Sequence, residues 1–262
     1  MIDSESYQAD EPSYVTATRS AYDVMVPGYL DLVRGELERN VFARAVLAAF
    51  AELIRGGGEA GAPVTAEGGA AEGGAPAVAG GGASAVTDGG APAVVEVGCG
   101  PGRITAHLAS LGLAASGLDL SPAMVARARA AHPELRFEVG DMTTLDLPEY
   151  SLAGLVAWYS LIHVPPEDHP GVLARFHRAL APDGHLLLAF QAGRELVHYE
   201  EAFGHRVSLD FHRLDPDRLT AELEAAGFEI RLRQECAPLP TEPTPQGYLV
   251  ARKVPERMGV MW

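Results

Sequence analysis

The chain has 262 residues, a length that fits one large domain or two small ones and can bury a sizeable core. Its 35 acidic and 20 basic residues give a formal net charge of -15, which would repel nucleic-acid backbones and anionic lipid surfaces. Because no stretch approaches the roughly 20 apolar residues of a membrane span and the N-terminus is polar and acidic, we expect a cytoplasmic protein that binds neither membrane nor nucleic acid.

Residues 29–54 carry apolar side chains at the spacing of amphipathic helices. Residues 55–92 differ: glycine makes up about a third of them, alanine most of the rest, and the sizeable apolar residues are three isolated valines. Ordering such a segment would cost backbone entropy with little burial in return. We therefore predict a disordered insert over 55–92, an expanded surface loop or alternatively a partner-binding segment.

From residue 93 onwards, short apolar runs alternate with helical stretches. Strict alternation of strand and helix is typical of a doubly wound parallel sheet, an α/β fold that binds ligands beyond the carboxyl ends of its strands. The predicted strands are 94–97, 115–118, 135–139, 152–158, 185–190, 228–233 and 248–252, and the predicted helices are 104–111, 122–131, 167–180 and 216–226.

Three glycines, Gly98, Gly100 and Gly102, follow the first of these strands. Glycine permits a sharp turn and lets a ligand approach the backbone, while N–H groups at the start of the next helix favour an anion or nucleotide. The dinucleotide fingerprint needs a third glycine at 103, where this chain has Arg103, and no lysine follows as in a P-loop. NAD and nucleoside triphosphates are therefore disfavoured.

Five segments together resemble the motifs of class I S-adenosylmethionine-dependent methyltransferases. "VEVGCGPG" is similar to the first motif, and four more follow in the family's order: "GLDLSPAMVARARA", "FEVGDMTTLDLP", "LVAWYSLIHVPPED" and "LAPDGHLLLAF". The resemblance covers residues 93–192. It implies a Rossmann-like, seven-stranded sheet whose last strand, "YLVARK", is antiparallel, with S-adenosylmethionine as cofactor and S-adenosylhomocysteine as product.

The same resemblance assigns a cofactor site. Glu96 would support the glycine turn near the methionine part, and Asp119, 19 residues after Gly100, would accept hydrogen bonds from both ribose hydroxyls. Asp119 could alternatively be a solvated acid at a strand end, and Asp141 a turn residue rather than the partner of the adenine amino group. The remaining assignments are Leu120 in the cofactor site, Met142 near the adenine, and Trp158 and Tyr159 along the cofactor. Trp158 is alternatively a core residue, and Tyr159 alternatively touches the acceptor.

The N-terminal segment, residues 1–54, resembles the helical lid of small-molecule methyltransferases. Tyr22, Asp23 and Tyr29 match a Y-D-x-x-A-x-x-Y-like pattern, although Val26 replaces its alanine. Tyr22 would bond the methionine carboxylate or close over the sulfonium, because an aromatic face attracts a cation. The alternative is ordinary helix packing. Pro27 interrupts helical hydrogen bonding, so we expect a bend in the lid there.

Two regions offer catalytic candidates. His163, just past the fourth predicted strand, suits a base or an acceptor-positioning group near neutral pH, or alternatively a structural role in its loop. An acceptor-site insertion at about 193–213 is dense in titratable groups, of which we single out Glu200 and His205. The alternative for this insertion is a solvated segment. His and carboxylate side chains could bind a metal there, but no spacing fixes a geometry, and we predict none.

The sequence thus predicts a lid segment (1–54), an insert (55–92) and a methyltransferase core (93–262). We expect methyl transfer to oxygen, nitrogen or carbon of a small molecule in bacterial biosynthesis, by a monomer or homodimer. Two alternatives remain: a protein that binds S-adenosylmethionine without methylating, for example a cyclase, and an NAD-dependent oxidoreductase. Cys99 and Cys236 are too few for a disulfide framework or a structural zinc site.

Overall fold

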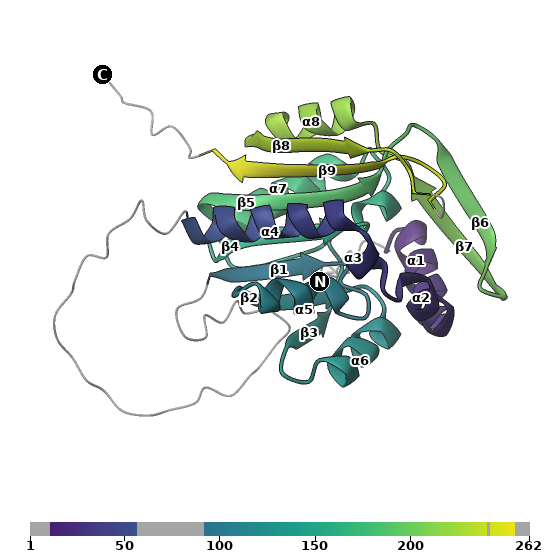
Figure 1. Ribbon diagram of the computed structural model, residues 1–262. Helices are drawn as coiled ribbons and strands as arrows, with labels where there is room; N and C mark the ends of the chain where they lie inside the picture. Colours follow the sequence, from purple (N-terminus) through teal and green to yellow (C-terminus); the bar gives the residue numbers. More distant parts are fainter. Residues whose placement is uncertain (1–10, 57–91, 240–241, 255–262) are drawn as a thin grey trace, which may run out of the picture.

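The computed structural model describes residues 11–56, 92–239 and 242–254 (Figure 1). Seven strands form one sheet in the order β3, β2, β1, β4, β5, β9, β8. From edge to edge these strands are Arg136–Val139, Ala114–Asp119, Ala93–Val97, Leu152–Trp158, Leu180–Gln191, Gln246–Lys253 and Phe228–Cys236. The predicted disordered insert lies outside the described residues from 57 to 91.

The strand directions confirm the predicted Rossmann-like α/β class. Strands β3, β2, β1, β4 and β5 pair in parallel, whereas β9 runs antiparallel to both of its neighbours, β5 and β8. The carboxyl ends of β1, β2 and β4 therefore meet at one edge of the sheet, where this fold places ligands. Strand β1 is buried at every position, as expected for a central parallel strand.

Helices cover both faces of the sheet (Figure 1). On one face α4 (Val41–Gly56) and α5 (Arg103–Ser110) pack in an apolar cluster that includes Phe50 of α4 and Val94 of β1. On the other face α7 (His169–Ala179) and α8 (Pro216–Ala225) share a second cluster with Val95 and Val97. The alternation of Val94, Val95 and Val97 between the clusters follows the two-residue period of a strand. Helix α6 (Pro122–Ala131) packs on β3.

The predicted lid segment divides into two parts. Helices α1 (Ser13–Val24) and α2 (Val26–Val33) lie at the carboxyl edge of the sheet, whereas α4 belongs to the core; α3 (Glu36–Arg39) connects them. The break between α1 and α2 at Met25 stands two residues before Pro27, which cannot donate a backbone hydrogen bond to the preceding turn. Among the described helices none is long and apolar enough to cross a membrane.

The insertion at 193–213 forms a hairpin, an element the sequence analysis did not predict. Strands β6 (Leu196–Ala202) and β7 (His205–His212) pair antiparallel, and their two-residue turn has positive φ at both Phe203 and Gly204, as the hairpin turn that fits strand twist requires. Leu209 and Phe211 of β7 join an apolar cluster with residues of α1. The hairpin therefore braces the helix that lies between it and the sheet (Figure 1).

Candidate functional site

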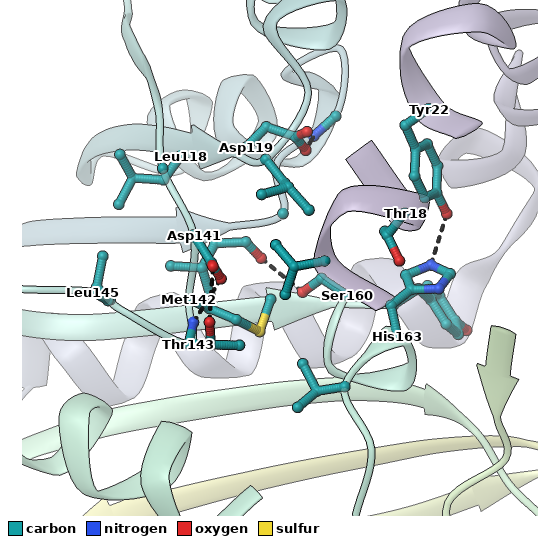
Figure 2. Close-up of a pocket in the computed structure, with 18 of the residues that line it drawn as sticks. Thr18, Tyr22, Leu118, Asp119, Asp141, Met142, Thr143, Leu145, Ser160 and His163 are labelled. Atoms are coloured by element: carbon teal, nitrogen blue, oxygen red, sulfur yellow. Dashed lines mark hydrogen bonds between the residues drawn. The ribbon is translucent and has the colours of Figure 1, made fainter. Parts of the chain in front are cut away.

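A pocket opens at the carboxyl ends of β1, β2 and β4, with α1 and α2 on its other side (Figure 2). Its volume is about 770 Å³, including the part open to solvent. The structure brings eleven of the predicted site residues to its lining: Tyr22, Tyr29, Gly98, Gly100, Asp119, Leu120, Asp141, Met142, Trp158, Tyr159 and His163. Trp158 is only 4% exposed and belongs to an apolar core cluster. It is therefore a core residue, as the alternative prediction has it, and a pocket residue at the same time.

Glu200 and His205 are not among the pocket residues, and their expected place at a reaction centre is corrected. Both are exposed on the hairpin. The physical reason is the strand register. Glu200 is the unpaired residue at the register shift between Tyr199 and Glu201, and His205 directly follows the turn, whereas Leu209 of β7 packs against Ala21 of α1. The many titratable side chains of this segment therefore lie on a solvated outer face of the hairpin.

The glycine turn follows β1 and is fixed by backbone hydrogen bonds. Gly98 N–H donates to the carbonyl of Leu118 over 2.7 Å, and its φ of +74° lies in the left-handed region. An added Cβ at Gly98 would stand 2.2 Å from the Cβ of Ser160. Gly102 caps α5 and abuts Phe137 instead of lining the pocket.

Replacing Gly98 by alanine is expected to lower the free energy of unfolding by about 3 kcal/mol, because positive φ and the clash with Ser160 add together. Thermal unfolding measures the change. Gly171→Ala is the matched control: Gly171 is exposed in α7 with nothing within 4 Å of an added Cβ, so this variant should be neutral or slightly more stable. Equal unfolding temperatures for the two variants would contradict the steric argument.

Asp119 ends β2 and is 8% exposed. One carboxylate oxygen accepts a hydrogen bond from Gly100 N–H at 2.7 Å and the other from Ser121 N–H at 2.8 Å, so the side chain ties the end of β2 to the glycine turn. Burial raises its pKa to about 6, although the two N–H donors lower it. Each oxygen keeps a further lone pair, so the carboxylate can also accept hydrogen bonds from two neighbouring hydroxyl groups.

Ligand affinity at Asp119 is expected to depend on pH. The pKa is raised, so the carboxylate is ionised above about pH 6, and its acceptor capacity is lost as the pH falls through that value. We expect the affinity for S-adenosylhomocysteine to be constant from about pH 7 to pH 8 and to fall below about pH 6 in calorimetric titrations. An Asp119→Asn protein should lose this dependence; an unchanged profile in that variant would assign the titration to another group.

Glu96 lies beneath the turn and not in the pocket lining. Its side chain is 2% exposed and accepts a hydrogen bond from the hydroxyl of Thr105 in α5. Burial raises the pKa of this carboxyl to about 8, against the lowering effect of the Thr105 hydrogen bond. Glu96 thus links β1 to α5, as a residue that supports the glycine turn should. Its contact with the methionine part of the cofactor stays a prediction.

Asp141 forms a turn. Its two carboxylate oxygens accept from the N–H and the hydroxyl of Thr143, at 2.8 and 2.7 Å (Figure 2). The turn alternative that the sequence left open is therefore present, while the same carboxylate and Met142 also line the pocket. An Asx turn leaves lone pairs on the carboxylate, so binding of the adenine amino group stays a prediction.

His163 stands at the end of a short 3₁₀ helix, Leu161–His163, with 8% exposure. Its Nδ1 lies 2.9 Å from the backbone carbonyl of Asp210 in β7, and its Nε2 lies 2.8 Å from the hydroxyl of Tyr22 in α1 (Figure 2). A carbonyl accepts, so Nδ1 carries the proton and Nε2 accepts from Tyr22. Burial lowers the pKa of His163 to about 4, which keeps the ring neutral near neutral pH.

Sequence reasoning missed the lid residues that complete the pocket. Tyr14, Val15 and Thr18 of α1 line it, and Thr18 points toward His163 (Figure 2). Their spacing along one helix face was the available signal. Asp23, which was noted for its match to the lid pattern, accepts hydrogen bonds from the Ser121 hydroxyl at 2.5 Å and from Ala123 N–H at 3.1 Å, and so fastens α1 to the start of α6.

Comparison with known proteins agrees with this geometry. A family model described as "Methyltransferase domain" matches residues 94–184. A trans-aconitate 2-methyltransferase of Variovorax paradoxus is 38% identical over 103 residues, 38% of this chain and 39% of the relative. A carboxy-S-adenosyl-L-methionine synthase of Chromohalobacter salexigens is 36% identical over 105 residues, 36% of this chain and 38% of the relative. The chain thus spans well under half the length of these curated relatives.

Residues 94–184 thus match the methyltransferase domain family, and the fold is that of class I S-adenosylmethionine-dependent methyltransferases. Solved structures share the fold of the methyltransferase domain. The magnesium protoporphyrin IX methyltransferase of Synechocystis PCC 6803, solved with bound S-adenosylmethionine, aligns with a TM-score of 0.59 at 16% identity, over 93% of this chain and 99% of that one. An S-adenosylmethionine-dependent methyltransferase of Methanosarcina mazei aligns with a TM-score of 0.56 at 19% identity, over 62% and 92%.

The residues of this methyltransferase domain fit S-adenosylmethionine. Asp119 has acceptor capacity left after its two backbone bonds, which suits a pair of ribose hydroxyls. Gly98 and Gly100 present backbone without a Cβ where a ligand must come close. Tyr22 and Tyr29 lie edge to face, with ring centroids 5.7 Å apart, and offer aromatic surface to a cationic sulfonium.

Proposed function

We propose that the protein transfers a methyl group from S-adenosylmethionine to a small-molecule acceptor. The observation that carries the proposal is that one pocket is lined both by the family's cofactor motifs, with Asp119 at their centre, and by the hydrogen-bonded pair of Tyr22 and His163. The names of the two curated relatives both refer to small molecules, which supports an acceptor of that size. The wider setting that we propose is bacterial biosynthesis in the cytoplasm, by a monomer or homodimer.

Bound S-adenosylmethionine supplies a methyl group that is activated by the positive charge on its sulfur. The chain then has two tasks: to orient an acceptor in line with that group, and to exclude water. Helices α1 and α2 form a wall of the pocket, to which α1 contributes Tyr14, Thr18 and Tyr22 and α2 contributes Tyr29. We infer that this wall helps to keep water from the reacting atoms.

His163 and Tyr22 supply a path for a proton. Because Nε2 of the neutral His163 already accepts the Tyr22 hydrogen, an acceptor hydroxyl that donates to the Tyr22 oxygen can pass its proton on while Tyr22 passes its own to Nε2. The Asp210 carbonyl holds the Nδ1 hydrogen throughout. His163 thereby acts as the base through Tyr22, and the hydroxyl of Tyr22 contacts the acceptor.

Calorimetric titration with S-adenosylhomocysteine, S-adenosylmethionine and NAD tests this function. We expect both sulfur compounds to bind and NAD to show no heat above dilution, because position 103 is arginine where a dinucleotide site needs glycine. Incubation with S-adenosylmethionine and a mixed acceptor library should then release S-adenosylhomocysteine. Binding with no release across the library would favour the non-methylating alternative, and NAD binding would favour the oxidoreductase.

A further inference from the structure

The lining of the pocket carries negative but no permanently positive side chains. Among its lining residues, which all belong to the part of the chain described here, the ionisable acids are Asp119 and Asp141, and there is neither lysine nor arginine. His163 is neutral near neutral pH, since burial lowers its pKa to about 4. The single lysine of the sequence, Lys253, donates to the carbonyls of His177 and Leu180.

Two arginines near the pocket, Arg19 and Arg103, already pair with carboxylates. Arg19 of α1 donates from both terminal nitrogens to Glu11, and Arg103 of α5 forms an ion pair with Glu36 at 2.6 Å. Two more carboxylates, Asp23 and Asp168, hold α1 at the edges of the pocket through hydrogen bonds to Ser121 and Tyr14. A carboxylate-bearing acceptor would therefore find no arginine or lysine in the pocket lining, although recognition of carboxylates normally uses one of these cations.

The acceptor side of the pocket is built from uncharged groups. Val15 and Val164 of the lining are apolar, while Thr18 and Tyr22 provide hydroxyls next to His163 (Figure 2). A neutral imidazole that accepts a proton through Tyr22 suits a nucleophile with a proton to lose. A carboxylate acceptor is ionised at neutral pH and has no proton to give, so methylating it would not require the Tyr22–His163 pair.

We propose that the acceptor of this site is an uncharged alcohol or phenol with an apolar body, and not a di- or tricarboxylate. This inference rests on the proposed function and narrows its substrate class. It separates the chain from the relative whose name refers to trans-aconitate, although the two are 38% identical over the matched 103 residues.

The reaction balances with the groups in the pocket. The bond from the acceptor oxygen to the methyl carbon forms as the bond from that carbon to sulfur breaks, and the electron pair of the broken bond stays on sulfur. The hydroxyl proton goes to Tyr22 and the Tyr22 proton to His163 Nε2, so the positive charge that leaves sulfur reappears on the imidazole. The pocket's net charge is unchanged, which spares the buried site a separation of charge.

Matched probe pairs test the substrate class. We would titrate the protein, saturated with S-adenosylhomocysteine, with 4-hydroxycinnamamide and 4-hydroxycinnamate, with 4-hydroxybenzamide and 4-hydroxybenzoate, and with trans-aconitate, using saturation-transfer NMR and calorimetry. Each pair shares its phenol and differs in one charge. We expect at least one amide to bind about tenfold or more tightly than its acid, and trans-aconitate not to bind. The proposal is overturned if the amide and the acid of both pairs bind equally well, or if neither member of either pair binds. Binding of trans-aconitate also overturns it.

A charge added to the acceptor wall sharpens this test. Thr18→Lys should raise the affinity for the carboxylate member of each pair by about tenfold, whereas Thr18→Gln, which is uncharged, should not. Titration with S-adenosylhomocysteine in all three proteins distinguishes a failure of the proposed function from a failure of the proposed substrate class. Loss of that binding in the wild type would mean that the proposed function fails, while intact binding together with a preference for acids would mean that the substrate class alone is wrong.

Discussion

Asp119→Ala is expected to weaken binding of S-adenosylhomocysteine by about two orders of magnitude. Two effects add. The variant loses a carboxylate that can accept from both ribose hydroxyls, and it frees the N–H groups of Gly100 and Ser121, which hold the glycine turn against the end of β2. Hydrogen bonds to a charged group contribute about 1.5 to 3 kcal/mol each, so the loss of two is enough for the predicted effect. Calorimetric titration at about pH 7.5, above the pKa of Asp119, measures it.

Two variants control this prediction. Asp146→Ala removes a carboxylate whose side chain is 88% exposed and pairs with Arg178, so S-adenosylhomocysteine should bind as in the wild type. Asp119→Asn keeps one acceptor oxygen and should fall between the wild type and the alanine variant. Wild-type affinity in Asp119→Ala would remove the assignment of this residue to the ribose and leave it a structural link between β2 and the turn.

His163→Ala is expected to lower kcat by about 100- to 10,000-fold, with little change in the affinity for S-adenosylhomocysteine. The variant removes Nε2, the atom that receives the Tyr22 proton as Tyr22 takes up that of the acceptor; the imidazole is oriented by the carbonyl of Asp210. Tyr22→Phe should cost less than His163→Ala if water can replace the phenol oxygen between acceptor and imidazole. The measurement is single-turnover formation of S-adenosylhomocysteine with whichever acceptor the library screen identifies.

His198 provides the control, because it contacts the same hairpin residue from the other side. Its Nδ1 lies 2.7 Å from the side chain of Asp210, and its own side chain is 44% exposed. His198→Ala should therefore leave kcat within about twofold of the wild type, since exposed pairs of this kind contribute little. If both histidine variants turn over at the wild-type rate, His163 has the structural role that its sequence position also allowed.

The sheet was predictable because its strands are buried on both faces. Runs such as VVEV at 94–97 and LLLAF at 186–190 are almost entirely apolar, and the first is followed directly by the glycine turn. The hairpin was not predicted because β6 is exposed along most of its length and shows no apolar alternation. In β7 the apolar residues Leu209 and Phe211 do alternate, and Phe203–Gly204 is a turn signal, but the dense charges around them suggested an acceptor wall.

The site was predictable only where local motifs carry it. Asp119 and the glycines are close in sequence to the strands that end at the pocket, so a motif places them. The proton on His163 depends on a carbonyl 47 residues away in the hairpin, and its partner Tyr22 lies 141 residues away in the lid. No local pattern encodes contacts of that range, and the packing of Leu209 against Ala21 and Met25 that creates them appears only once the chain is folded.

The contact between Asp210 and His163 involves a main-chain oxygen. A substitution at position 210 changes the side chain, which faces His198, and leaves that oxygen in place. Mutational variation at this residue can therefore alter the surface of the hairpin without altering the tautomer of the buried imidazole. A deletion or insertion of one residue in β7 would instead reverse the direction of each carbonyl along the strand, so the length of the hairpin is under stricter constraint than its amino-acid identity at position 210.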